Sequence, residues 1–91
     1  MVISFRRSAF RHGVSEERSR YVIEHCPSPS YAEAPAREGD KVLFLWADSY
    51  GVPLEVGAIE VGSGDLVVIH AMRMRTIYQA EYRRLLQWSR Q

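Results

Sequence analysis

The chain has 91 residues and a formal net charge of +1, and 46% of its residues are hydrophobic and 25% charged. These values are typical of one ordinary globular domain and exclude a disordered, collagen-like or coiled-coil chain. The longest apolar run, residues 42–47, is far shorter than the roughly 20 residues of a membrane-spanning helix. Cys26 is the single cysteine, and arginines interrupt the apolar residues at the start. We therefore expect one domain over residues 1–91, in the cytoplasm and without membrane contact.

Charge is unevenly distributed along the chain. Residues 1–20 carry a net +3 and residues 73–91 a net +4, whereas residues 21–72 carry −6. If the two ends meet in the fold, they form one basic surface on an otherwise acidic domain. Basic surfaces bind phosphate groups, so this pattern favours a nucleic acid or an acidic partner.

The first third of the chain predicts two short helices. Residues 5–11 or 5–12 form the first, and Gly13 follows in the position that favours a left-handed backbone. Ser15 is the expected N-cap of the second helix, which has carboxylates in its first turn. Pro27 ends this helix because the residue before a proline prefers extended geometry.

The remaining sequence predicts a sheet followed by a helix. Residues 27–40 hold three prolines and form a loop or an irregular edge strand. Three strands joined by short turns follow at residues 42–47, 54–61 and 66–74. A capping-box pattern from Thr76 starts a helix that runs to about Trp88. The expected fold class is α+β, with two N-terminal helices, an antiparallel sheet of three to four strands and a C-terminal helix.

Glu81 interrupts the apolar side of the predicted C-terminal helix. At 100° per residue it falls between Leu85 and Trp88, and a buried carboxylate needs a cationic or hydrogen-bonding partner. Arg73 and Arg75, on the preceding strand, are the nearest candidates. Glu81 is therefore expected either to form a structural ion pair or to orient an arginine or accept a proton at a functional site.

Strand alternation places Arg73 and Arg75 on one face of the third strand, together with Ile69 and Ala71, and His70 on the other. Two guanidinium groups so spaced can grip a phosphate and stabilise the charge that develops at phosphorus. A solvated strand end or a protein interface is the alternative interpretation.

The three histidines have different predicted surroundings. His12 lies between the two predicted helices in an arginine-rich segment, where an imidazole can exchange protons beside an anionic ligand. His70 lies in mid-strand, where a hydrogen-bonded core histidine is the simpler interpretation, and His25 complements a helix end. No metal-ligand spacing is present, and the motifs of nucleotide-binding enzymes and serine hydrolases are absent. We expect neither a metal nor a cofactor.

Tyr78 and Tyr82 are four residues apart on the predicted C-terminal helix. This is the spacing of a core stripe, and core packing is the default interpretation. If exposed, the same rings can stack on unpaired bases.

Three segments, RRSAFRHGVSEERSRYVIEH, GVPLEVGAIE and DLVVIHAMRMRTIYQAEY, resemble the toxins of bacterial type II toxin–antitoxin systems. The likeness is nearest to the BrnT-like branch of the RelE/ParE superfamily and covers about residues 5–82. The family's arginine after the strand alanine is replaced by Met72, and Arg73 follows one place later. The positions that match the family's motifs are Arg11, His12, Gly13, Ile69, Ala71, Glu81 and Tyr82.

The resemblance implies an α+β toxin that inhibits translation by metal-independent RNA cleavage and that binds a cognate antitoxin. A homodimer and a toxin–antitoxin hetero-oligomer are both compatible with it. A non-catalytic relative that binds a protein target, such as gyrase, or that serves as an interaction module is the alternative. Joined with the residue patterns, the resemblance gives a catalytic set of His12, His70, Arg73, Glu81 and Tyr82 and a phosphate-binding set of Arg11, Arg75 and Tyr78. Within the catalytic set, His12 or Glu81 is expected to activate the 2′-hydroxyl, and His70 or a tyrosine to protonate the leaving oxygen.

Overall fold

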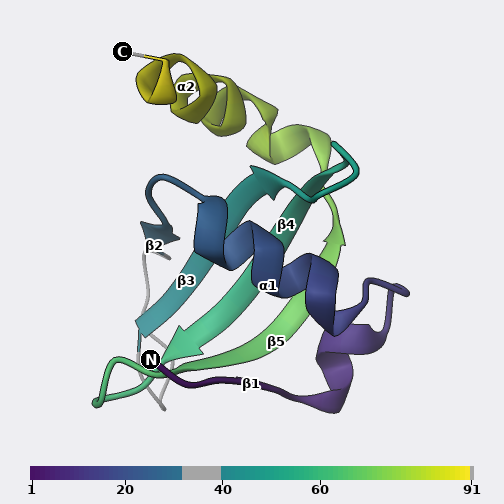
Figure 1. Ribbon diagram of the computed structural model, residues 1–91, viewed down its shortest axis with the longest axis vertical. Coiled ribbons are helices and arrows are strands. Elements are labelled where there is room, and N and C mark those ends of the chain that lie inside the picture. The colour runs from purple at the N-terminus through teal and green to yellow at the C-terminus, as the bar shows by residue number, and fades with distance from the viewer. Residues whose placement is uncertain (32–39, 91) are drawn as a thin grey trace.

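The computed structural model describes residues 1–31 and 40–90. Five strands form one mixed sheet in the order β1-β5-β4-β3-β2, in which β1 is parallel to β5 and the other neighbours are antiparallel. Helix α1 crosses one face of the sheet, and α2 lies beyond the end of β3 (Figure 1). In chain order the elements are β1 (Ile3–Phe5), the 3₁₀ turn η1 (Arg7–Phe10), α1 (Glu16–His25), β2 (Ser30–Tyr31), β3 (Asp40–Ala47), β4 (Pro53–Glu60), β5 (Leu66–Arg73), the 3₁₀ turn η2 (Thr76–Tyr78) and α2 (Gln79–Ser89).

The prediction of a first N-terminal helix is wrong. Residues 3–5 form β1, and only Arg7–Phe10 turn, as the short η1. Ile3 is buried in the core, and the Arg6 N–H donates to the carbonyl of Val68 at 2.9 Å. A short isolated helix is marginally stable in water, whereas pairing with the edge of β5 gives this segment both hydrogen bonds and burial.

The predicted second helix is confirmed as α1. The Ser15 hydroxyl accepts a hydrogen bond from the Arg18 N–H at 3.2 Å, as expected of an N-cap. Gly13, just before it, has a φ of 76°, in the left-handed region that glycine adopts without strain. Cys26 is extended before Pro27, and the helix ends there.

The α+β class and the three predicted strands are confirmed, but the sheet is not wholly antiparallel. β1 adds a parallel strand at one edge, and the two-residue β2 adds an antiparallel strand at the opposite edge. Of the proline-rich stretch, residues 32–39 lie outside the described residues. The C-terminal helix is present, although neither η2 nor α2 has a side-chain cap, so the capping box predicted at Thr76 does not form.

A β-bulge in β5 determines which side chains face α1. The register shifts at residues 57–58 of β4, where Val68 and then His70 find partners and Ile69 between them does not. Val68 and Ala71 both lie in the core beneath α1, although they are three residues apart. The strict alternation predicted for this strand is therefore wrong after Val68, and His70 faces the side opposite α1.

The core lies between α1 and the sheet face that it covers. Burial of one aliphatic side chain stabilises a fold by about 1.5–3 kcal/mol, so this layer contributes strongly to the stability of the fold. Within the described residues, no helix is long and apolar enough to cross a membrane. The buried hydrophobic residues of the core between α1 and the sheet are Ile3, Ala9, Val14, Val22, Ile23, Val42, Phe44, Leu54, Val56, Ala58, Leu66, Val68 and Ala71.

Asp48, directly after β3, connects α1 to the turn before β4. Its side chain has no exposed surface and accepts hydrogen bonds from Arg18 Nε at 2.7 Å and from the backbone N–H groups of Tyr50 and Val52 at 2.9 Å. Burial alone would raise the pKa of this carboxyl, but the hydrogen bonds from Val52, Arg18 and Tyr50 outweigh burial and lower the pKa.

We expect Asp48→Ala to reduce the free energy of unfolding by about 2 kcal/mol at pH 7, because buried hydrogen bonds to a charged acceptor are lost. A lowered native pKa makes this stabilisation complete at neutral pH, and it is lost as pH falls through the native pKa, below roughly 3.9. Chemical denaturation at pH 7 and pH 3 should therefore show a difference from wild type that narrows in acid. Asp40→Ala, at an exposed position, is the control. If wild type and Asp48→Ala differed in free energy of unfolding by the same amount at both pH values, the stabilisation would not come from the charged form of Asp48.

Candidate functional site

A buried carboxylate lies at the centre of the candidate site, on the sheet face opposite α1. Glu55 stands in β4 between Leu54 and Val56, which both face the core, so its side chain points to the other side. It accepts the Arg75 backbone N–H and Nε–H on Oε1, each at 2.9 Å, and Arg75 Nη2–H on Oε2 at 2.8 Å. His70 Nε2 lies 3.1 Å from Oε2.

These hydrogen bonds keep Glu55 in its charged form. Its side chain is 0% exposed, and burial alone would raise its pKa. The side-chain and backbone donors of Arg75 and the ring of His70 outweigh burial and lower the pKa. A carboxylate saturated in this way is a poor proton acceptor, so Glu55 positions its two neighbours.

The imidazole rings of His70 and His12 lie next to each other. Because Glu55 is ionised, Nε2 of His70 donates the hydrogen bond, and Nδ1 is left as the proton-accepting nitrogen. The His70 side chain packs against Gly57, its partner on β4. His12, between η1 and α1, meets His70 edge-on, with ring centroids 5.9 Å apart. One imidazole is thus held by a carboxylate, and the other is exposed beside it.

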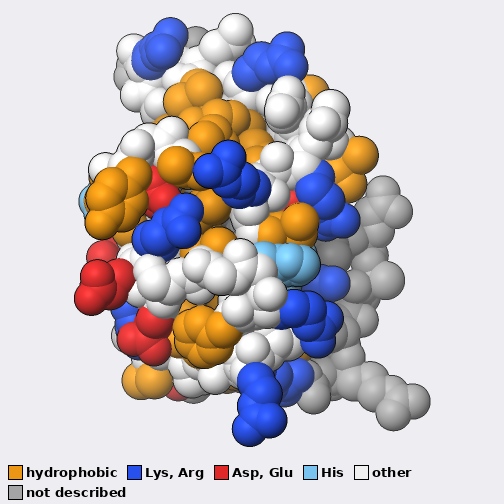
Figure 2. All heavy atoms as spheres, turned by 90° about the vertical axis from the view of Figure 1, so that its right-hand side faces the viewer, with side chains coloured by type: hydrophobic (Ala, Val, Ile, Leu, Met, Phe, Trp, Pro, Cys, Tyr) orange, Lys and Arg blue, Asp and Glu red, His pale blue; other side chains and the backbone are white. Residues whose placement is uncertain are grey.

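A hollow of about 130 Å³ beside His70 is lined by two cationic side chains, Lys41 and Arg75, and by Tyr78. The Arg75 guanidinium lies 5.5 Å from the centroid of the Tyr78 ring, and half of the Arg75 side chain is exposed. Nη1 of Arg75 makes no bond to Glu55 or to any other described residue, so it can bind an anion. The molecular surface formed by β5 and η1 shows a histidine bordered by Lys and Arg side chains (Figure 2). We call Glu55, His70, His12, Arg75, Tyr78 and Lys41 the Glu55 site.

Arg73 does not share this site with Arg75. It pairs with Leu54, whose side chain faces the core, so the Arg73 side chain starts on the α1 side of the sheet. There it lines a separate hollow of about 400 Å³ with Tyr82 and Arg83. The prediction that Arg73 and Arg75 grip one phosphate together is therefore wrong.

Glu81 and Tyr82 also lie outside the Glu55 site. Glu81 forms an ion pair with Arg84, whose Nε–H donates at 3.0 Å, and it accepts from the Ser30 hydroxyl at 3.5 Å. The Arg84 guanidinium lowers the pKa of Glu81. Tyr82 packs edge-on against Trp46 at 6.0 Å, and burial raises its pKa. Glu81 is partly exposed and pairs with Arg84 on its own helix, so the predicted ion pair with Arg73 or Arg75 on the preceding strand is wrong.

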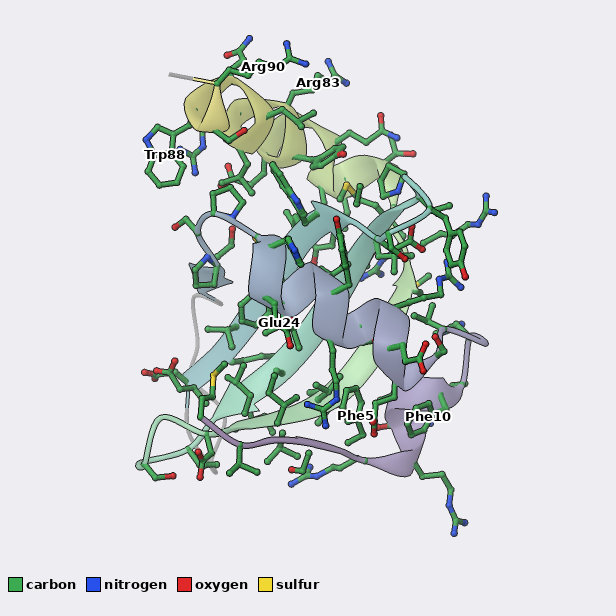
Figure 3. All side chains as sticks on the ribbon, viewed as in Figure 1. Phe5, Phe10, Glu24, Arg83, Trp88 and Arg90 are labelled. Carbon is green, nitrogen blue, oxygen red and sulfur yellow. The ribbon has the colours of Figure 1, made fainter. Side chains whose placement is uncertain are left out.

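Most of the two basic ends of the chain lie far apart. Arg83 and Arg90 lie at one end of the long axis, whereas η1 with Phe10 lies toward the other (Figure 3). Arg11 accompanies η1, next to His12. The two basic segments meet only at the Glu55 site, where Arg75 lies near His12, because α2 extends beyond β3 while β1 and η1 lie beside β5.

Two members of the Glu55 site, Glu55 and Lys41, were not predicted as site residues. For Glu55 a signal exists in the sequence, since it is the single charged residue of the otherwise apolar run Leu54–Ile59. A carboxylate there must be buried or must leave the strand, and a buried carboxylate requires a cationic partner. Lys41 carries no comparable signal, because lysines at strand ends are common on solvated surfaces.

Arg75→Gln is expected to lower any activity of this site by about 10²-fold, because the guanidinium both holds Glu55 and faces the hollow. Arg73→Gln, two residues away and on the other face, is the matched control and should retain activity within about twofold. Initial rates of RNA cleavage at equal protein concentration measure the contrast. Equal losses in both variants would show that the two arginines act together after all.

Within the described residues, no group of three or more His, Cys, Asp and Glu side chains could hold a metal ion. Comparison of the chain with known protein families, curated proteins and solved structures finds no match.

Proposed function

We propose that the protein is a metal-independent endoribonuclease and the toxin of a bacterial type II toxin–antitoxin pair. The observation that carries this proposal is the contact between His12 and the Glu55-bound His70, beside the guanidinium of Arg75. Two imidazoles supply the base and the acid that RNA transesterification requires. The toxin role rests on the sequence resemblance, whose first motif contains His12 and whose strand motif surrounds His70.

In the proposed reaction, His70 is the base and His12 the acid. Nδ1 of His70 takes the proton of a ribose 2′-hydroxyl, and the 2′-oxygen attacks the adjacent phosphorus. The bond from phosphorus to the 5′-oxygen breaks, and the imidazolium of His12 protonates that leaving oxygen. The products are a 2′,3′-cyclic phosphate and a 5′-hydroxyl. Glu55 fixes the His70 tautomer and stabilises the positive charge that the ring gains.

Arg75 and Lys41 are assigned to the phosphate. As the 2′-oxygen attacks, negative charge builds up on the non-bridging oxygens, and prepositioned cations stabilise it. Arg75 is prepositioned because Glu55 holds three of its N–H donors and leaves Nη1 directed elsewhere. Tyr78 limits the movement of the guanidinium through its ring contact.

Expression in bacteria tests the proposed role. Wild type should arrest growth and fragment cellular RNA, whereas a His12→Ala, His70→Ala double variant should do neither. His25→Ala removes a histidine that hydrogen-bonds the Tyr21 carbonyl on α1, and this control should remain toxic. Equal growth arrest by the wild type and the double variant, without RNA fragmentation, would favour binding to a protein target instead.

A further inference from the structure

A third hollow, of about 440 Å³, lies on η1 next to His12. It is lined by Arg7, Ser8, Phe10 and Arg11. The Ser8 hydroxyl donates to the carbonyl of Ile69 at 2.7 Å, which fastens η1 to β5 at the bulge next to His70. The hollow is therefore held at a fixed place beside the Glu55 site.

An exposed and well supported aromatic ring forms one wall of this hollow. Phe10 is 44% exposed, and its ring stacks on Phe5 with centroids 5.7 Å apart and an interplanar angle of 27°. Phe5 in turn lies 5.3 Å from the guanidinium carbon of Arg20. The two phenylalanines lie together beside η1, whereas Trp88 is at the far end of the molecule (Figure 3). A flat ligand can extend this ordered stack with little loss of side-chain freedom.

The remaining walls are cationic. Arg7 and Arg11 are exposed, and neither has an ion-pair partner among the described residues. Guanidinium groups bind phosphate oxygens, and an exposed aromatic ring stacks on an unpaired base. Charge and shape together fit a nucleotide of a single strand, because the bases of a duplex already stack on one another.

We infer that this hollow binds the nucleotide next to the one cleaved at the Glu55 site, with its base stacked on Phe10 and a phosphate between Arg7 and Arg11. We call it the Phe10 subsite. The inference rests on the proposed function and deepens it, since it assigns single-stranded RNA as the substrate class. The subsite gives affinity for any unpaired base, because every base presents a flat face.

Binding of a fluorescent single-stranded RNA with 2′-O-methyl groups throughout tests the subsite. This probe cannot be cleaved, so affinity is measured apart from chemistry. Phe10→Leu should weaken binding about tenfold, and Phe10→Trp should restore it, because stacking is lost and regained. Trp88→Leu, which removes an exposed aromatic ring from α2, is the matched control and should leave the Kd unchanged. Thermal unfolding confirms that each variant is folded.

The arginines are tested in the same assay. The double variant Arg7→Gln, Arg11→Gln should bind the RNA more weakly, and the slope of log Kd against log salt concentration should fall by the amount expected for about two phosphate contacts. The double variant Arg83→Gln, Arg90→Gln should change neither the Kd nor the slope. Equal affinity of the Phe10→Leu variant and the wild type would overturn the inference, and so would equal affinity for a duplex of the same sequence. Phe10-dependent binding by a protein that does not cleave all-ribose RNA would retain the subsite and refute the proposed function. If Phe10→Leu changed neither cleavage nor binding, the subsite would be refuted and the proposed function retained.

Discussion

His70→Ala is expected to lower the rate of RNA cleavage by a factor of about 10²–10⁴, the range for loss of a general base. His70 is the imidazole that Glu55 orients, with Nδ1 left to accept the 2′-hydroxyl proton. His12→Ala should cause a loss of similar size, because the leaving oxygen then has no positioned proton donor. Single-turnover cleavage of a labelled oligonucleotide measures both rates. The double variant should be little slower than the worse single variant, since the two groups act in one step.

His25→Ala is the control for both histidine variants. His25 is exposed on α1, stacks on Tyr21 and has no contact with the Glu55 site. Its substitution should leave the cleavage rate within about twofold of wild type. If His25→Ala were as slow as His70→Ala, the losses would report a general effect of removing a histidine. The roles assigned to the two site histidines would then be wrong.

Glu55→Gln is the second substitution with a large expected effect. It keeps the shape of the side chain but replaces charged acceptors for Arg75 and His70 with a neutral amide. The nearest precedent is the carboxylate that orients a catalytic histidine in serine proteases, whose replacement by an amide costs about 10⁴ in rate. We expect a loss of about 10²–10⁴ in cleavage rate, together with a loss of roughly 2 kcal/mol in the free energy of unfolding.

Glu60→Gln, on the same strand as Glu55 but partly exposed, should change neither quantity. The comparison requires cleavage rates and denaturation curves from the same protein preparations. A Glu55→Gln variant that unfolds more easily yet cleaves RNA at the wild-type rate would assign Glu55 to stability alone. The pairing with His70 would then have no catalytic role.

The three central strands and α1 could be predicted because local signals coincide there. Apolar runs bounded by turn residues predict β3, β4 and β5, and Ser15 with two following carboxylates predicts the start of α1. β1 could not be predicted, because its strand character comes from pairing with β5, more than 60 residues away. Three residues give too short a pattern to reveal such a partner.

The candidate site was predicted in part for a related reason. His12, His70, Arg75 and Tyr78 do come together, whereas Arg73 falls on the other face. Arg73 and Arg75 part because β5 ends at Arg73, whereas Arg75 already caps η2, so strand alternation does not reach it. The bulge at Ile69 turns His70 away from the face of Val68, and a bulge depends on how two strands pair, which alternation along one strand cannot show. A carboxylate inside an apolar strand is the signal that could have identified Glu55.

The most direct test of the proposed chemistry uses an oligonucleotide with one ribose in an otherwise deoxyribose strand, incubated with wild-type protein and EDTA. A 2′-hydroxyl nucleophile requires one cut, on the 3′ side of that ribose, with a 2′,3′-cyclic phosphate end. Mass spectrometry of the fragments identifies this end group. The proposed chemistry predicts this one cut, which gives two fragments, and no cut in the all-deoxyribose strand. An intact oligonucleotide, or equal cleavage of the all-deoxyribose strand, would contradict it.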